Sequence, residues 1–164
     1  GLKTLVPRVI GQKAKASRPR RQWDELSFFR ELEARHGSDS ASVAQKLLEW
    51  ARSHQLQIWW GRGIRSGSFV PFFNHRGKDH QLFALWTYGT VEMYFQWYQY
   101  KPPFDSEDRR QELLARLNAI EGVSIPEDAI ARRPSIPLTV FADETRLAEF
   151  LKVYEWFVQE IQAT

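Results

Sequence analysis

The spacing of apolar residues predicts that the folded part of the chain begins with two helices. From Trp23 they recur at every third position, which indicates a helix over 23–36 that is stopped by the following glycine. A second helix is expected from a cap at Ser40 or Ser42 to about His54, because its apolar residues share one face. Each helix therefore has one apolar stripe to bury against a core.

Beyond these helices the pattern changes to short aromatic and aliphatic runs between glycine-containing turns. Runs at 58–60, 68–73 and 81–86 indicate the strands of a meander. The clearest two-residue period spans 91–100, where core-type residues alternate with polar or amphipathic ones. The residues of this second kind are Glu92, Tyr94, Gln96, Tyr98 and Tyr100. A hairpin at 88–90 makes this strand the antiparallel neighbour of the one before it.

The last third of the sequence predicts a helix, a short helical turn, a strand and a final helix. Asp105 caps the first of these helices, which ends at Gly122. An edge strand follows over 136–141, and Asp143 caps the C-terminal helix. The whole pattern predicts a single α+β domain over 22–164, with two N-terminal helices, an antiparallel meander of about four strands, then a helix, a strand and a C-terminal helix.

The composition excludes several classes of protein and of chemistry. With 164 residues, 43% of them hydrophobic and 14% aromatic, the chain has enough apolar material for one core and is not disordered throughout. The absence of cysteine excludes disulfides, thiolate zinc sites, iron–sulfur clusters and a cysteine nucleophile. No apolar run approaches the roughly 20 residues of a membrane span, so we expect a cytoplasmic protein with no membrane partner.

Positive charge is concentrated at the start of the chain. Residues 1–21 contain seven Lys and Arg and no acid, so the overall charge of +3 leaves −4 for the remaining 143 residues. We interpret 1–21 as a basic flexible linker or arm, either simply solvated or in contact with phosphates. Because the chain begins with Gly1, we expect it to be attached to other domains of a longer parent chain.

The familiar catalytic patterns are absent from the sequence. The four histidines lack the spacing of a metal site, and the glycine-rich stretch at 61–68 lacks the lysine of a phosphate-binding loop. No serine lies in a GxSxG turn, and no Asp or Glu has a lysine two positions later, as many metal-dependent nucleases require. The sequence therefore predicts no catalytic residue, no metal and no cofactor.

The glycine-rich stretch is nevertheless a candidate binding site. Its two arginines can contact a phosphate or carboxylate while its serines add donors, although the same residues also fit an ordinary turn whose arginines face water. The full set of candidate ligand-binding residues is Trp59, Trp60, Arg62, Arg65, Ser66, Ser68, Lys78, Trp86, Tyr88, Arg132 and Arg133. We expect three of its four aromatic rings to lie in the core.

The amphipathic face of the 91–100 strand has two interpretations. Its tyrosines resemble the rings on which single-strand binders stack bases. The predicted helices, however, need a sheet face on which to bury their apolar stripes. We favour burial of these tyrosines under helices.

Four segments carry a resemblance to a known family: WWGRG at 59–63, GSFVP at 67–71, LFALWTYG at 82–89 and RRPSIPL at 132–138. With these motifs, about residues 23–162 resemble a widespread prokaryotic module of unknown function, which is itself distantly similar to nuclease-associated domains of restriction-like systems. The resemblance implies an α+β core akin to a degenerate restriction-endonuclease-like fold. The missing acid–x–Lys pattern departs from the active members of that superfamily.

These observations favour a non-catalytic recognition or accessory module that helps a larger prokaryotic protein to engage DNA or RNA. Phosphate contacts are expected from the arginines and lysine of the candidate set. One alternative is a divergent metal-dependent nuclease that uses Glu92 with Asp79 or Glu49. Another is a protein-interaction domain whose acidic body binds a partner without nucleic acid.

Overall fold

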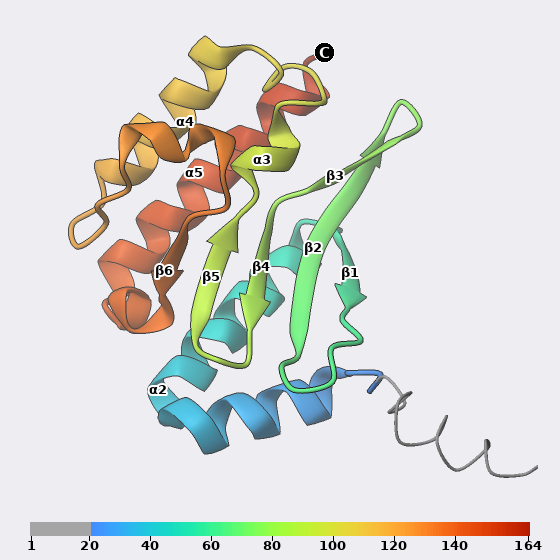
Figure 1. Ribbon diagram of the computed structural model, residues 1–164, viewed down its shortest axis with the longest axis vertical. Helices are drawn as coiled ribbons and strands as arrows, with labels where there is room; N and C mark the ends of the chain where they lie inside the picture. The colour runs from blue at the N-terminus through green and yellow to red at the C-terminus, as the bar shows by residue number, and fades with distance from the viewer. Residues whose placement is uncertain (1–20) are drawn as a thin grey trace, which may run out of the picture.

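The computed structural model describes residues 21–164, so the predicted basic arm lies outside the described residues except for Arg21. The described chain is an α+β fold in which helices pack on an antiparallel sheet (Figure 1). In chain order its elements are α2 (Glu25–Ser53), β1 (Gln57–Trp60), β2 (Ser68–His75), β3 (Lys78–Gln81), β4 (Phe83–Trp86), β5 (Thr90–Met93), α3 (Phe95–Tyr98), α4 (Glu107–Asn118), η1 (Glu127–Ala131), β6 (Ser135–Pro137), η2 (Leu138–Ala142) and α5 (Glu144–Gln162).

The sheet has the order β1-β2-β4-β5-β6, and all its pairings are antiparallel. β3 extends the β2 hairpin at one end, and β3 and β4 form one strand interrupted at Leu82. Between the pairs Phe72–Gln81 and Phe69–Leu85, two residues of β2 oppose three of β3–β4. This extra residue is a β-bulge, which bends the strand.

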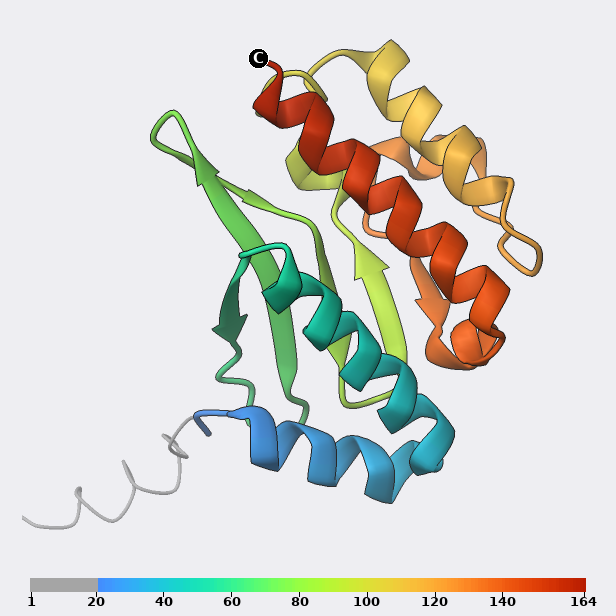
Figure 2. The same cartoon turned by 180° about the vertical axis from the view of Figure 1, so that it is seen from behind.

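Helices cover one face of the sheet. Figure 2 shows α2 and α5 lying side by side across it, and their apolar stripes form the core with the inward residues of the strands. The packing is rich in aromatic rings: Phe83 lies 4.9 Å from Tyr154 and 5.4 Å from Phe150, between ring centroids. In the view of Figure 1 the opposite face of β1, β2, β4 and β5 has no helix over it.

The two predicted N-terminal helices are confirmed. Asp24 caps the first, accepting a hydrogen bond from the backbone N–H of Ser27 at 2.8 Å. Helical hydrogen bonding continues through both, but Gly37 has φ 87° and breaks the axis between them. A positive φ with ψ near 180° suits glycine alone. The glycine therefore fixes the angle at which the second half of α2 meets the sheet.

The predicted strand over 91–100 is wrong beyond its first residues. β5 ends at Met93, and Phe95–Tyr98 form the single helical turn α3. The buried rings in this segment are Phe95 and Tyr98, a spacing of three that fits a helical turn and not a strand. The Tyr98 hydroxyl donates to the carbonyl of Leu82 and lies 3.1 Å from the Tyr154 hydroxyl, which holds α3 against the core.

Other boundaries in the C-terminal part also differ from the predictions. Ser106, not Asp105, caps α4 by accepting from the backbone N–H of Arg109. The predicted strand over 136–141 is limited to β6, because the chain continues from Leu138 as the short helix η2. The predictions of an edge position for β6 and of Asp143 as the cap of α5 are confirmed.

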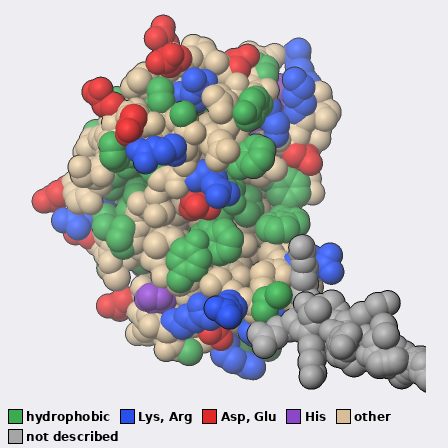
Figure 3. All heavy atoms as spheres, in the orientation of Figure 1, with side chains coloured by type: hydrophobic (Ala, Val, Ile, Leu, Met, Phe, Trp, Pro, Cys, Tyr) green, Lys and Arg blue, Asp and Glu red, His purple; other side chains and the backbone are tan. Residues whose placement is uncertain are grey.

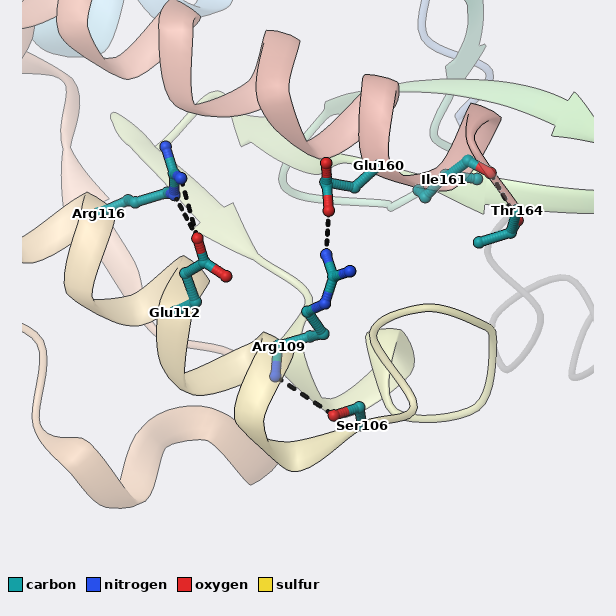
Figure 4. Close-up of polar contacts among 7 residues, drawn as sticks. All are labelled: Ser106, Arg109, Glu112, Arg116, Glu160, Ile161 and Thr164. Carbon is teal, nitrogen blue, oxygen red and sulfur yellow. Dashed lines mark hydrogen bonds and ion pairs between the residues drawn. The ribbon is translucent and has the colours of Figure 1, made fainter.

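One ion pair and one cation–π contact join α4 to α5. Figure 4 shows the Arg109 guanidinium donating to the Glu160 carboxylate across the two helices. Within α4, Arg116 pairs with Glu112 at 2.9 Å, and its guanidinium lies 4.0 Å from the Trp156 ring of α5. These side chains are therefore engaged in helix packing rather than in binding.

Candidate functional site

The sheet face that α2 and α5 leave uncovered, here called the open face, is unusually aromatic. Side chains alternate across a strand, so the register of each pair defines which residues share this face. Trp59 pairs with Val70, Gln57 with Phe72, and Ser68 with Trp86, each pair pointing away from the helices. Figure 3 shows hydrophobic side chains gathered on this surface with Lys and Arg side chains around them.

Part of the open face is hollowed into an aromatic groove between the β1–β2 hairpin and α3. The groove encloses about 630 Å³, within the range of sites for small molecules. Its lining residues are Trp59, Val70, Phe72, Asp79, Gln81, Tyr94, Trp97, Tyr100 and Lys101. Exposed fractions of 51% for Trp59, 49% for Trp97 and 66% for Tyr100 leave these rings accessible to a ligand.

The turn to α3 explains how the groove arises. Had the strand continued past Met93, it would have extended the sheet. Instead the backbone N–H groups of Trp97 and Tyr98 both donate to the Tyr94 carbonyl, at 2.8 and 3.0 Å, which closes a helical turn. The chain thus leaves the sheet, and the α3 turn buries Tyr98 while Trp97 and Tyr100 stay exposed. The two exposed rings form one wall of the groove, and the sheet forms its floor.

Polar groups collect at one end of the groove. The Asp79 carboxylate accepts a hydrogen bond from the Asn74 amide at 3.0 Å. The Lys101 ammonium donates to the backbone carbonyl of Asp79 and lies 3.5 Å from the Gln81 side-chain oxygen. Burial lowers the pKa of Lys101, and the nearby Asp79 opposes that shift. An acceptor and a donor are therefore held side by side at the end of an apolar surface.

A second aromatic group lies on the open face next to the groove. The rings of Trp86 and Tyr88 stack 5.1 Å apart, and the Trp86 indole donates to Glu92 at 3.2 Å. Burial, together with the charge of Glu92, raises the pKa of Tyr94 to about 12, and Arg133 acts in the opposite direction. The same causes raise the pKa of Tyr88. Both hydroxyls remain hydrogen-bond donors at neutral pH.

The glycine-rich loop between β1 and β2 is held by contacts from α2 and from Trp23, which precedes that helix. The Trp23 indole donates to the Gly63 carbonyl at 2.7 Å, and Arg35 donates to the Arg65 carbonyl at 2.6 Å. A Cβ at Gly67 would overlap the Trp23 ring, so this close approach requires glycine. The loop therefore has a conformation fixed by hydrogen bonds and close packing, and Arg65 is exposed on it.

Two of the predicted binding residues prove unsuited to a ligand. Ser68 is only 4% exposed, and Gly61 of the neighbouring segment lies against its hydroxyl, so the prediction of Ser68 as a ligand donor is wrong. Trp60 is half-buried on the helix side, where it packs against Phe28 and Phe69. It faces inward because alternate residues of β1 point to opposite sides of the sheet.

Most of the remaining predicted residues are exposed polar or charged residues outside the groove. Ser66 lies 3.4 Å from Arg35, and Arg132 pairs with Asp128 at 2.6 Å. The side chains of Arg62, Arg65, Lys78, Arg132 and Arg133 are all exposed. Of these cations, Arg133 lies near enough to Tyr88 and Tyr94 for its charge to act on the pKa of both hydroxyls.

The expectation that three of the four candidate rings are in the core is wrong. Only Trp60 packs against the core cluster; Trp59 and Tyr88 are exposed and Trp86 is half-buried. The expected burial of the tyrosine face under helices is wrong for Tyr100 and correct for Tyr98, whereas Tyr94 is half-buried and packs against the core. The reason is that α2 and α5 both pack on the other face of the sheet.

About half of the residues that line the groove are not predicted from the sequence. Phe72, Gln81, Trp97 and Lys101 are not among the predicted candidates, and Asp79 is expected there only as a metal ligand. The one signal available is the spacing of Trp97 and Tyr100, which places both on the same side of a helical turn once Tyr98 is buried. Nothing in the sequence indicates that Lys101 lies beside Asp79.

Within residues 21–164 there is no group of three or more His, Asp or Glu side chains arranged to hold a metal ion. Glu92 accepts from Trp86 on the open face, whereas Glu49 lies on α2, which covers the opposite face. Of the two partners expected for Glu92 in a nuclease, Glu49 is therefore separated from it by the sheet, whereas Asp79 lies on the open face as Glu92 does. None of the helices in the described region has the length and apolar character to cross a membrane.

Comparison of the chain with protein-family models, with curated proteins and with solved structures gives no match.

Proposed function

We propose that this protein is a recognition module that binds single-stranded nucleic acid on the open face. The observation that carries the proposal is the set of accessible rings on and beside the uncovered face of the antiparallel sheet: Trp59, Trp97, Tyr100 and the Trp86–Tyr88 stack. Proteins that bind single strands stack successive bases on such rings, each worth about 1–3 kcal/mol.

Cations at the margins of the open face fit the same ligand. Lys101 lies at the groove, Arg133 beside Tyr88 and Tyr94, and Arg65 on the loop at the end of the sheet. They would contact phosphates while the rings between them take bases. Duplex binders present a basic surface to two phosphate backbones, whereas here the centre of the face is apolar, which favours a single strand with unpaired bases.

The test is binding of fluorescent single-stranded RNA and DNA, and of the matching duplex, to the full chain by fluorescence anisotropy. Trp59→Ala combined with Trp97→Ala should weaken single-strand binding by roughly 5- to 100-fold for each base that no longer stacks. Leu26→Ala is the control, because Leu26 is an apolar residue on α2 that is 67% exposed, more than either tryptophan.

Three results would contradict the proposal: no binding to any single strand, equal loss of affinity in the Leu26→Ala control, or tighter binding of the duplex. Loss of all nucleic-acid binding would favour a protein partner for the open face instead. A cleavage product in the presence of Mg²⁺ would restore the nuclease alternative.

A further inference from the structure

We propose that the aromatic groove selects guanine among the bases of a single strand. This inference rests on the proposed function and adds a base preference to it. It comes from the polar end of the groove, where the Asp79 carboxylate, the Gln81 amide and the Lys101 ammonium stand against a floor and walls made largely of rings. A site of this type takes a flat heterocycle and reads one polar edge of it.

The walls of the groove set the shape of the ligand. Trp97 and Tyr100 lie on one side with ring centroids 6.4 Å apart, and Trp59 lies on the other, over Val70 and Phe72. A base inserted between these rings would stack on at least one of them. Its edge would then meet the strand β3, because Asp79 and Gln81 are two positions apart and share a face.

The polar groups distinguish the four bases. An ionised carboxylate only accepts hydrogen bonds and has two oxygens side by side, whereas a lysine only donates. Guanine alone offers two neighbouring donors, N1–H and the N2 amino group, next to an acceptor, O6. Asp79 would accept from the two donors while Lys101 donates to O6. Adenine, cytosine and uracil each have an acceptor where guanine has one of these donors. Each of them would therefore place an acceptor against the carboxylate, which itself only accepts.

Contacts within the protein hold the Asp79 carboxylate and the Lys101 ammonium in position to recognise guanine. The Asn74 amide donates to one Asp79 carboxylate oxygen at 3.0 Å. Lys101 donates to the backbone carbonyl of Asp79, so its ammonium is tied to the same residue as the acceptor. A guanine would therefore meet a donor and an acceptor that are already oriented, which reduces the ordering cost of binding.

The experiment measures binding of the full chain to oligouridine strands that carry one central guanosine, adenosine or inosine. We expect the guanosine strand to bind roughly 5- to 100-fold more tightly than the adenosine strand, which is the discrimination that a bidentate hydrogen-bonded contact to a base provides. Inosine lacks the N2 amino group and should fall between them. Asp79→Asn should remove the preference, because an amide presents a donor to one of the guanine donors.

Controls separate this inference from the proposed function. Asp39→Asn neutralises an exposed carboxylate on α2 and should leave the preference intact. Equal binding of all three strands, or a preference that survives Asp79→Asn, would overturn guanine selection while leaving single-strand binding in place. Absence of binding to any strand would overturn both. Free guanosine monophosphate that binds as tightly as the guanosine strand would also overturn the inference, since the groove would then be a nucleotide site.

Discussion

Trp59 and Trp60 are neighbours in sequence, yet one is exposed on the open face and the other packs against Phe28 and Phe69. The difference follows from the two-residue alternation of a strand. Sequence alone indicates that the two rings point in opposite directions, but not which one faces the helices. The side of the sheet on which a residue lies therefore decides whether it belongs to the core or to the candidate site.

The clearest consequence of burial for a single side chain concerns His80. Burial, reinforced by the nearby charges of Lys101, His75 and Lys78, lowers the pKa of His80 to about 4, with Asp79 opposing the shift. An unfolded chain takes up this proton near pH 6.5, whereas the folded protein does so only near pH 4. The contribution of neutral His80 is thus complete above pH 6.5 and is lost as the pH falls toward 4.

We therefore predict that the free energy of unfolding, measured by urea denaturation, decreases as the pH is lowered from 6.5 to about 4. His80→Phe should reduce the decrease, because Phe does not titrate and can keep the stacking on Phe73, whose ring lies 5.5 Å from that of His80. If His80→Phe loses stability as steeply as the original protein when the pH is lowered, groups other than His80 cause the effect.

Among the elements, the turn α3 does most to shape the candidate site and is the least predictable. The alternation over 91–100 matches a strand well, but a strand would place Tyr98 and Tyr100 on the same face. In the structure Tyr98 is 4% exposed and Tyr100 is 66% exposed. The pairing of Tyr98 with Leu82 and Tyr154, residues far away in sequence, overrides the local pattern.

This difference gives a matched pair of variants. Tyr98→Phe leaves the Leu82 carbonyl and the Tyr154 hydroxyl without their buried partner, so it should lower the free energy of unfolding by about 1–3 kcal/mol. Tyr100→Phe removes the same hydroxyl from an exposed ring and should change stability by less than about 0.5 kcal/mol. Thermal or urea unfolding measures both. Equal effects would contradict the burial and hydrogen bonding of the Tyr98 hydroxyl.

Across the molecule as a whole, charge and aromatic surface are carried by different parts of the chain. Residues 1–21 hold seven basic residues, whereas the remaining 143 have a net charge of −4. Attraction to phosphate depends steeply on salt, while stacking on rings depends on it little. The two contributions to binding can therefore be separated by experiment.

We predict that a chain lacking residues 1–20 still binds single strands, with a smaller dependence of affinity on salt. For every phosphate that the shortened chain no longer neutralises, the slope of log affinity against log salt should become shallower by about 0.7. Adding Trp59→Ala and Trp97→Ala to the shortened chain should lower affinity without a further change in slope. Anisotropy at several salt concentrations measures both quantities. Complete loss of binding on deletion would assign recognition to the basic segment.

The α+β class, the break at Gly37, the hairpin at Gly89 and the cap at Asp143 are predictable from the chain alone, because each depends on residues close together in sequence. Packing in three dimensions, by contrast, places α2 and α5 on one face of the sheet and leaves the other open. It also turns α3 away from the sheet and brings Trp97 and Lys101 to the groove that Asp79 lines. These outcomes depend on contacts between distant segments, and the local pattern of residues carries no information about which face such contacts will bury.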